Sequence, residues 1–188
     1  MTSRTDSPVL PDVVLDSRGV ILRPFTEADV DDVVVAATDE LTQQWLPLPR
    51  PYTRDHARWF CLEFPEAQRS SGNGLVRAVE AEGRLAGAID LKRTDRSTGT
   101  TEIGYWSAPW ARGRGFMTTA TRCLAEWALR EEGLERVVLM AATGNVASQR
   151  VAEKAGFRRE GVARSACVTH DGRVDVVVYS LIRADLEP

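Results

Sequence analysis

The sequence has few of the residues that build metal centres and disulfide frameworks. Its 188 residues include three cysteines, Cys61, Cys123 and Cys167, and two histidines, His56 and His170. The cysteines are far apart and form no C-x-x-C pair, which favours reduced, mostly buried thiols over a disulfide framework. Two isolated histidines argue against a histidine-rich metal centre. We therefore expect no metal site and a cytoplasmic protein.

Long apolar runs and a strong excess of one charge are also missing. No apolar run approaches the 18 or more residues of a membrane span, and the first dozen residues lack the apolar segment of a secretory signal. Lys and Arg number 24 against 27 Asp and Glu, a formal net charge of −3. This balance argues against a protein that coats nucleic acid. We expect a soluble protein with neither nucleic-acid nor membrane partners.

No repeat, low-complexity tract or linker divides the chain. A chain of this length can bury about 70% of the surface that its unfolded form exposes, so its core needs no metal or disulfide. Residues 1–11 are polar and Pro-containing and are predicted to be a flexible N-terminal leader. Residues 12–188 are predicted to form a single domain.

Hydrophobic patterning predicts strands and helices in a mixed order. The expected strands cover 13–15, 20–23, 75–79, 85–91, 101–107, 136–142, 158–167 and 174–182, the first two forming a hairpin or a single bent strand. The expected helices cover 26–37, 53–68, 115–130 and 146–155. Thr26 followed three residues later by Asp29 resembles a capping box at the start of the first helix, with Asp in place of Glu. The continuous apolar stretch 136–142 is typical of a strand buried on both faces. We predict a mixed α/β fold: one mostly antiparallel, twisted sheet of about seven strands, parallel at strands 4–5, with about four flanking helices.

The sharpest local feature is a glycine-rich turn, Arg112-Gly113-Arg114-Gly115, between an expected strand and an amphipathic helix. Its glycines permit positive φ and close approach of the backbone to a ligand. The helix start offers unpaired N–H groups and a positive dipole end, which suit a pyrophosphate. The alternative is a tight turn with two solvated arginines. Thr118 stands where a dinucleotide-binding G-x-G-x-x-G motif has its last glycine, which disfavours that fold.

Several motifs in sequence order resemble those of the GNAT N-acetyltransferases. They are Glu102-Ile103-Gly104-Tyr105-Trp106, Pro109 with the glycine turn, Asn145-Val146-Ala147-Ser148, and Glu153-Lys154-Ala155-Gly156-Phe157. The segments Leu22-Arg23-Pro24, Thr26-Glu27-Ala28-Asp29 and Tyr179-Ser180-Leu181 are similar to the RimJ/RimL-like branch, which acetylates protein N-terminal amines. The resemblance covers roughly residues 13–184 and implies the GNAT fold with acetyl-CoA as co-substrate.

The resemblance also implies roles for individual residues. It assigns cofactor binding to Trp106, Ser107, Arg112, Gly113, Arg114, Gly115, Phe116, Met117, Thr118, Asn145, Ser148 and Lys154. It assigns the acceptor side to Trp45, Leu46, Tyr52 and Tyr105, with the segment 45–52 overhanging the site. A backbone N–H near Trp106 or Ser107 would stabilise the oxyanion. Asn145 is also a plausible helix cap.

The sequence departs from the family pattern at three positions. Trp110 stands where the glycine motif often begins with Gln or Arg. Ala152 stands where many members have a tyrosine that acts as the acid for the thiolate. The resemblance to the RimJ/RimL-like branch, in which the Ser of Asn-x-x-Ser is the usual replacement, implies Ser148 as the candidate acid. Cys167 stands at the position of a glutamate base found in some members, so Glu102 becomes the candidate base.

Each catalytic assignment has an alternative interpretation. Glu102 could be a solvated strand carboxylate or an ion-pair partner, and Ser148 could be a cofactor contact without proton transfer. Tyr105 and Tyr179 are more typical of sheet residues than of acids. An α-amine with a pKa of about 8 is about a tenth neutral at pH 7, whereas lysine is neutral at below about a thousandth. A modest base therefore favours an N-terminal amine.

The favoured function is acetyl transfer to the α-amine of a protein or peptide N-terminus. Two alternatives remain open: acetylation of a small amine, such as an aminoglycoside, polyamine or amino-sugar, and non-catalytic acyl-CoA binding. The net charge of −3 mildly favours cationic acceptors. A homodimer is also a possibility, with apolar area supplied around Trp59 and Phe64.

Overall fold

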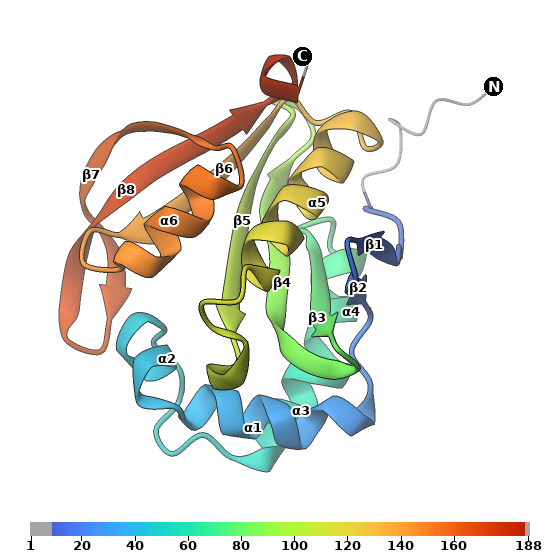
Figure 1. Cartoon of the computed structure of the whole chain (residues 1–188), viewed down its shortest axis with the longest axis vertical. Coiled ribbons are helices and arrows are strands. Elements are labelled where there is room, and N and C mark those ends of the chain that lie inside the picture. Colours follow the sequence, from blue (N-terminus) through green and yellow to red (C-terminus); the bar gives the residue numbers. More distant parts are fainter. Residues whose placement is uncertain (1–8, 187–188) are drawn as a thin grey trace.

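A computed structural model describes residues 9–186 and shows one sheet between two layers of helices (Figure 1). The strands are β1 (Leu15–Ser17), β2 (Val20–Arg23), β3 (Leu75–Ala81), β4 (Arg84–Asp95), β5 (Thr100–Ser107), β6 (Arg136–Ala142), β7 (Arg158–Thr169) and β8 (Gly172–Ile182). The α-helices are α1 (Val30–Thr38), α2 (Glu40–Trp45), α3 (Arg54–Leu62), α4 (Phe64–Ser70), α5 (Phe116–Arg130) and α6 (Val146–Lys154). Short 3-10 turns η2 (Glu27–Asp29), η3 (Pro109–Ala111) and η4 (Arg183–Leu186) complete the described chain.

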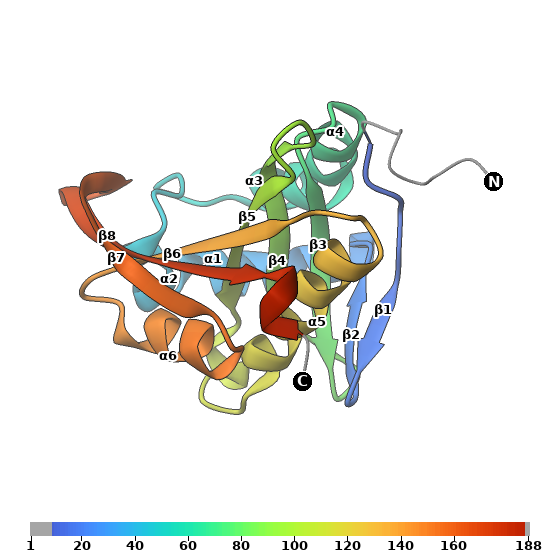
Figure 2. The same ribbon diagram turned by 90° about the horizontal axis from the view of Figure 1, so that it is seen from above.

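The sheet confirms the predicted α/β architecture. Within residues 9–186 it has eight strands in the order β1-β2-β3-β4-β5-β6-β8-β7. Neighbours are antiparallel except β5 and β6, which are parallel. Helices α3 and α4 lie on one side of the sheet and α5 and α6 on the other (Figure 2). The strand count exceeds the expected seven because residues 15–23 form the two-stranded hairpin β1–β2.

The larger apolar core lies between the sheet and α5. Apolar residues recur on one face of this helix, and Ala120, Leu124 and Ala128 are fully buried there. They belong to one cluster with Ile103 of β5 and Leu139 of β6, so α5 fixes the position of the parallel strand pair. This core holds in place the strands on which the candidate site is built.

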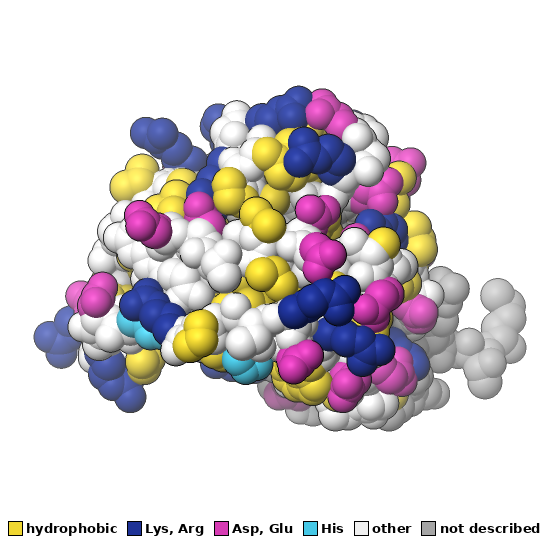
Figure 3. Space-filling model, turned by 90° about the horizontal axis from the view of Figure 1, so that it is seen from below, with side chains coloured by type: hydrophobic (Ala, Val, Ile, Leu, Met, Phe, Trp, Pro, Cys, Tyr) yellow, Lys and Arg dark blue, Asp and Glu magenta, His cyan; other side chains and the backbone are white. Residues whose placement is uncertain are grey.

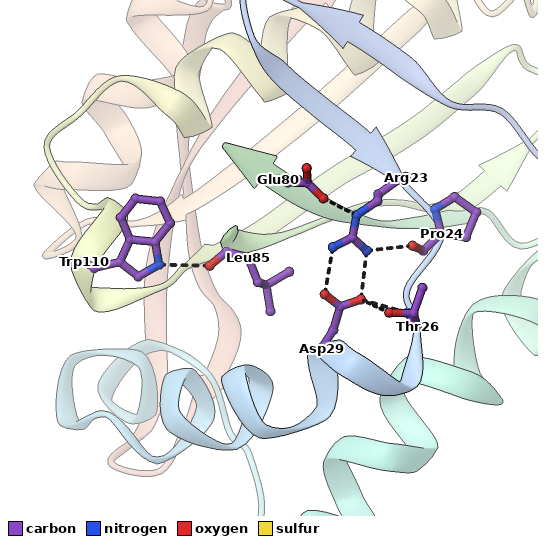
Figure 4. Close-up of polar contacts among 7 residues, drawn as sticks. All are labelled: Arg23, Pro24, Thr26, Asp29, Glu80, Leu85 and Trp110. Atoms are coloured by element: carbon purple, nitrogen blue, oxygen red, sulfur yellow. Dashed lines mark hydrogen bonds and ion pairs between the residues drawn. The ribbon is translucent and has the colours of Figure 1, made fainter. Parts of the chain in front are cut away.

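A smaller apolar core lies on the face of the sheet opposite α5, and ion pairs at its edge stabilise it. Val33 of α1 and Ala57 of α3 are buried against Val76 and Ala88 of the sheet. The start of the α1 segment is held by Asp29, as Figure 4 shows. Both its oxygens accept hydrogen bonds of 2.8 Å from the Arg23 guanidinium, whose Nε also donates to a carboxylate of β3, Glu80.

The predicted capping box at Thr26 is confirmed. The Thr26 N–H donates to Asp29 Oδ2 at 2.8 Å, and the Thr26 hydroxyl lies 3.1 Å from the same oxygen. Although burial opposes it, hydrogen bonding to Arg23 and Thr26 holds the pKa of Asp29 below its ordinary value. The carboxylate thus links β2, β3 and α1 in its ionised form.

Two helical predictions needed correction. The helix expected over 53–68 is divided into α3 and α4, because Pro65 lies in the first turn of α4, where its missing N–H is harmless, and would break a continuous helix. The short helix α2 was not predicted. It is capped by Asp39, whose side chain accepts from Thr42 N at 3.0 Å.

The prediction that strand 136–142 is buried on both faces is wrong. Burial alternates along β6: Val137, Leu139 and Ala141 are buried against α5 and α6, while Met140 on the other face is 41% exposed. On that second face of β6 and β8, Val138, Met140, Val178 and Ile182 are partly buried or exposed, whereas Val176 and Ser180 are buried. We call this surface the open face.

Three further sequence predictions meet the structure. Residues 1–8 of the expected leader lie outside the described residues, but Leu10 is fully buried, so a flexible segment does not extend to residue 11. Within residues 9–186 no helix is both long and apolar enough to cross a membrane. All three cysteines are free, but of these Cys61 alone is buried, and burial raises its pKa to about 12.

Candidate active site

The candidate site is built where β5 and β6 diverge. Their parallel pairing runs from Thr100–Arg136 to Ile103–Leu139. Beyond these pairs β5 continues beside β4 through Gly104 to Ser107, while β6 continues beside β8. Figure 1 shows the two strands separating toward α2. The backbone of β5 after Ile103 therefore has a strand partner on one side only.

The glycine turn enters α5 with an uncapped helix end. Gly113 and Gly115 have φ of +73° and +83°, and Gly115 is the left-handed N-cap of the 15-residue helix α5. No side chain of the cap residue bonds to the first-turn N–H groups, which have no partner within a helix. A Cβ built at either glycine meets nothing within 4 Å. The turn thus presents bare backbone and a positive helix end.

Both arginines of the turn are paired rather than free. Arg112 contacts Asp39 and donates to the Thr42 hydroxyl at 2.9 Å. Hydrogen bonding to Arg112 holds the pKa of Asp39 below its usual value. Arg114 forms a double hydrogen bond with Glu82, with distances of 3.0 and 2.6 Å. Arg112 is therefore ion-paired and mostly buried, while Arg114 is ion-paired at the surface, with 42% of its side chain exposed.

Trp110, which departs from the family pattern, fastens the turn to β4. Its indole Nε1 donates to the Leu85 carbonyl at 3.0 Å, as Figure 4 shows. The Arg84 guanidinium lies 4.5 Å from the ring centroid, and Phe116 packs against the ring at 6.0 Å. At this position the family often has a polar residue, whereas here the Trp110 side chain connects the turn to β4.

Helix α2 contacts both sides of the divergence. At its start, Asp39 and Thr42 hold Arg112 of the glycine turn. At its end, Trp45 lies against the β6–α6 loop, where a Cβ built on Gly144 would be 3.1 Å from the indole ring. The unpredicted helix thus links the two walls of the site.

Two predicted residues meet on the α6 side of β5. The Tyr105 hydroxyl lies 2.8 Å from Ser148 Oγ and donates to the Ser148 carbonyl at 3.2 Å. Burial raises the pKa of Tyr105 to about 12, although hydrogen bonding to Ser148 acts in the opposite direction. Asn145 caps α6, its side chain accepting from Ser148 N at 3.1 Å. A protonated phenol and a serine hydroxyl thus adjoin the divergence.

The opposite side of β5 carries charge. Glu102 Oε2 accepts from Arg93 at 2.6 Å, and Lys92 Nζ lies 3.4 Å from Oε1. This places the predicted base in two ion pairs, as one alternative interpretation allowed. Asp90 of β4, which the sequence analysis did not single out, pairs with Gly104 across the ladder. Burial raises the pKa of Asp90, the Lys92 charge opposes the shift, and the Glu102 charge adds to it.

The remaining predicted residues are distributed around these groups. Met117 is buried under the turn and contacts the Gly87 position of β4, while Phe116 and Thr118 are partly buried in the first turn of α5. Trp106 packs near Phe60 with centroids 6.4 Å apart, and Ser107 ends β5. Lys154 is exposed in the last turn of α6.

The predicted acceptor residues have different neighbours. Trp45 lies at the β6–α6 loop, whereas the Tyr52 ring packs 5.5 Å from His56 of α3. Tyr52 also lines a cavity of about 410 Å³ with Thr38, Glu40, Gln43, Arg50 and Pro51. Leu46 is partly buried just after α2.

Comparison with known proteins identifies the fold and its chemistry. The sequence profile of the acetyltransferase (GNAT) domain matches residues 20–158. The chain belongs to this family. It is therefore a GNAT N-acetyltransferase, and the divergence of β5 and β6 with the glycine turn lies within the matched GNAT domain.

Individual relatives agree with this assignment. The chain is 30% identical over 167 residues to YdaF of Bacillus subtilis (strain 168), named as a candidate ribosomal N-acetyltransferase; the match covers 89% of this chain and 91% of YdaF. A solved structure titled as a probable acetyltransferase superposes with a TM-score of 0.82 at 28% identity, covering 92% and 98% of the two chains. The solved RimL, a ribosomal L7/L12 α-N-protein acetyltransferase in complex with coenzyme A, shares the fold at 22% identity, a TM-score of 0.80 and coverage of 90% and 98%.

Proposed function

We propose that this GNAT enzyme transfers the acetyl group of acetyl-CoA to the α-amine of a protein or peptide N-terminus. The observation that carries the proposal is the open face, where Met140 beside the divergence is 41% exposed and Ile182, paired with Arg136 at the other end of β6, is 38% exposed. A partly apolar surface next to the charged groups of β5 suits a short length of chain whose first residue enters the site. The names of YdaF, a candidate ribosomal N-acetyltransferase, and of RimL, a ribosomal L7/L12 α-N-protein acetyltransferase, support the same acceptor class.

The donor would be held at the glycine turn. The positive φ values of Gly113 and Gly115 would let the backbone of the turn approach the ligand closely. The N-terminus of α5 favours a pyrophosphate. Arg112 and Arg114 would exchange their carboxylate partners for phosphate oxygens, a charge-assisted contact of the same kind. Asn145, Ser148 and the exposed Lys154 supply polar groups on α6 for the rest of the molecule.

A backbone donor for the oxyanion follows from the β4–β5 ladder. Ala108 N donates to Ala86 O at 2.8 Å, so this residue pair is hydrogen-bonded. Antiparallel pairs alternate, which directs the N–H of Ser107 away from β4 and toward the side vacated by β6. Of the two predicted positions, Ser107 rather than Trp106 therefore suits a developing oxyanion.

Proton delivery to the departing thiolate would fall to the Tyr105–Ser148 pair. The serine hydroxyl, carried by α6, lies 2.8 Å from the phenol oxygen. Ser148 would give its proton to sulfur and take one from the Tyr105 hydroxyl, which in turn regains a proton from solvent. Burial raises the pKa of Tyr105 to about 12, so the phenol is protonated before each turnover.

The acceptor assignment is tested by acetylation of a defined panel. Peptides with free N-termini, the same peptides with blocked N-termini and an internal lysine, aminoglycosides and polyamines are incubated with acetyl-CoA, and mass spectrometry locates the acetyl group. We expect turnover at the α-amine and none on the blocked peptides. A small amine as the best acceptor would contradict the proposal. CoA binding without turnover of any amine would instead support a non-catalytic module.

Two further expectations accompany this function. An acceptor of ribosomal origin would be met in the cytoplasm, the compartment predicted from the sequence. The homodimer also stays a prediction: Trp59 is 51% exposed and its ring lies 5.2 Å from that of Phe64. Light scattering at micromolar concentration should give twice the 20.8 kDa chain mass; a monomer mass would contradict it.

A further inference from the structure

We propose that Asp90, rather than Glu102, is the carboxylate that takes the proton from the acceptor amine. The proposal deepens the proposed function at the level of amine acetylation, whichever amine is the acceptor. Asp90 pairs across the ladder with Gly104, the first residue of β5 beyond the last β5–β6 pair. The carboxylate therefore stands at the divergence itself, whereas Glu102 lies two residues earlier, within the paired part of β5.

The space over Gly104 is occupied by two charged groups. A Cβ built at Gly104 would lie 2.7 Å from Asp90 Oδ1 and 2.6 Å from Lys92 Nζ. Both groups therefore bend across the strand at a position where the sequence provides no side chain. Any larger residue would displace them, so glycine here keeps the carboxylate beside the β5 backbone.

The two carboxylates differ in what they already bind. Glu102 is engaged by Arg93 at 2.6 Å and by Lys92 at 3.4 Å. Within residues 9–186, Asp90 has no ion pair within 4.0 Å, and its polar partners are the backbone N–H groups of Asp90 and Gly104. Asp90 thus has no direct ion-pair partner, while the Lys92 ammonium beside it is bound by Glu102. Glu102 then acts as a positioning residue.

The surroundings of Asp90 suit a base. Burial raises its pKa, and the charged groups acting on it are Lys92, which opposes that rise, and Glu102, which adds to it. The neighbouring positions on β3 and β5 are Val76 and Gly104, which carry no charge. A carboxyl with a raised pKa accepts a proton more readily than an ordinary aspartate.

The open face provides the approach. Glu102 pairs with Val138, and Met140 follows on the same face of β6, so this surface borders the side of β5 on which Asp90 and Glu102 lie. An amine crossing the open face reaches Asp90 on one side of β5, while Tyr105 and Ser148 stand on the other. The strand separates the group that takes a proton from the groups that supply one.

The step balances as follows. The ammonium gives one proton to Asp90, and the neutral nitrogen forms a bond to the thioester carbonyl carbon. Collapse of the adduct breaks the carbon–sulfur bond and releases a second proton from nitrogen. The thiolate takes one proton, through Ser148, and the other passes from Asp90 to solvent.

The test is the pH dependence of kcat/KM in three variants, measured with the best amine of the panel. Asp90→Asn should lower the rate about 100-fold near pH 6.5. The loss should shrink to a few-fold above about pH 9, where an α-amine is mostly neutral. An aminooxy peptide, whose nitrogen is already neutral at pH 7, should show a correspondingly small loss.

Substitutions of Lys92 and Glu102, the two charged neighbours of Asp90, should shift the pH profile in opposite directions. Lys92→Met removes a charge that lowers the pKa of Asp90, so the pH profile should move to higher pH. Glu102→Gln removes a charge that raises it, so the profile should move to lower pH and the base should persist. The fall of kcat/KM at low pH reports the ionisation of the general base. The proposal would be overturned if Glu102→Gln abolished this fall and Asp90→Asn retained it. A pH-independent loss in Asp90→Asn would also overturn it, by making Asp90 structural.

This outcome is separate from that of the acceptor panel. A small amine as the best acceptor refutes the proposed N-terminal acceptor but leaves the three profiles fully informative. Unfolding is excluded as a cause by CoA affinity, which Asp90→Asn should leave within about twofold of wild type, because the carboxylate lies on the face away from α6.

Discussion

On the side of β5 covered by α5 and α6, Tyr105 meets Ser148 through hydroxyl groups over a large apolar core. On the opposite side, Asp90, Lys92 and Glu102 place charges beside a smaller core and an open face. The first side is neutral and packed, and the second is charged and partly exposed. Acetyl transfer to an amine needs both environments, because a thiolate must be protonated and an ammonium must be deprotonated.

The same contrast appears in what stabilises each layer. The α5 layer is fixed by apolar contacts, with Leu124 completely buried. The α1 layer depends on the ionised carboxylate Asp29, which binds Arg23 through both oxygens. The two sides should therefore respond differently to truncation and to pH.

The largest expected effect is on the neutral side. Ser148→Ala should lower kcat roughly 10- to 1,000-fold at every pH with little change in CoA affinity, because the variant loses the hydroxyl between Tyr105 and sulfur. Steady-state kinetics from pH 6 to 9 measure this, with the surface variant Ser97→Ala as control. Tyr105→Phe should be milder, since Ser148 remains. A wild-type kcat in Ser148→Ala would reduce the serine to a cofactor contact.

The next effect concerns the packing of α5. Leu124→Ala should lower the free energy of unfolding by about 3 kcal/mol, because it leaves a cavity under a completely buried position. Urea denaturation measures the loss. Leu41→Ala, at a side chain 44% exposed, should change the value by less than about 0.5 kcal/mol. Equal losses would mean that α5 is not the main apolar contact of the sheet.

A smaller effect, sensitive to pH, is expected on the charged side. Asp29→Asn should cost about 2 kcal/mol at pH 7, because it breaks a largely buried ion pair. The folded pKa of Asp29 is below its ordinary value, so its stabilisation is present above about pH 4 and is lost as pH falls further. The denaturation curves of Asp29→Asn and wild type should therefore differ at pH 7 and lie close together at pH 3. A pH-independent difference would assign the loss to packing.

The smallest expected change is in donor affinity. The double variant Gly113→Val and Gly115→Val should weaken CoA binding at least about tenfold, because Cβ atoms at positive φ block the backbone approach. Gly19→Val provides the control: its φ is +77° and its Cβ also meets nothing within 4 Å, but it lies in the β1–β2 turn. Calorimetry should show unchanged affinity in the control. Unchanged affinity in the double variant would contradict the site.

Local patterns predicted most of the fold. The period of α5 and the cap at Thr26 specify their elements through neighbouring residues alone, and the structure confirms both. The exposure of Met140 depends instead on whether a helix covers that part of β6, which Val137-Val138-Leu139-Met140 cannot encode locally. The same run of apolar residues can form a strand with one exposed face or a strand buried on both faces.

The candidate site was proposed from short local motifs. The glycine turn offers backbone at the start of α5 and the Asn145 side chain caps α6, and neighbouring residues alone specify both features. The ion pairs of Arg112 and Glu102 join residues from separate elements, so spacing along the chain could not reveal them. Asp90 did leave a signal: it is a lone charge in the apolar strand segment 85–91.

Gly104 also limits which sequences this fold tolerates. Even a methyl group there would meet Lys92 Nζ at 2.6 Å and Asp90 Oδ1 at 2.7 Å, although the backbone conformation does not itself require glycine. In a saturation library selected for folding, substitutions at Gly104 should survive by swinging the flexible lysine away. Selection for turnover should then remove them. A side chain at this position would therefore lower catalytic activity more than it lowers the stability of the fold.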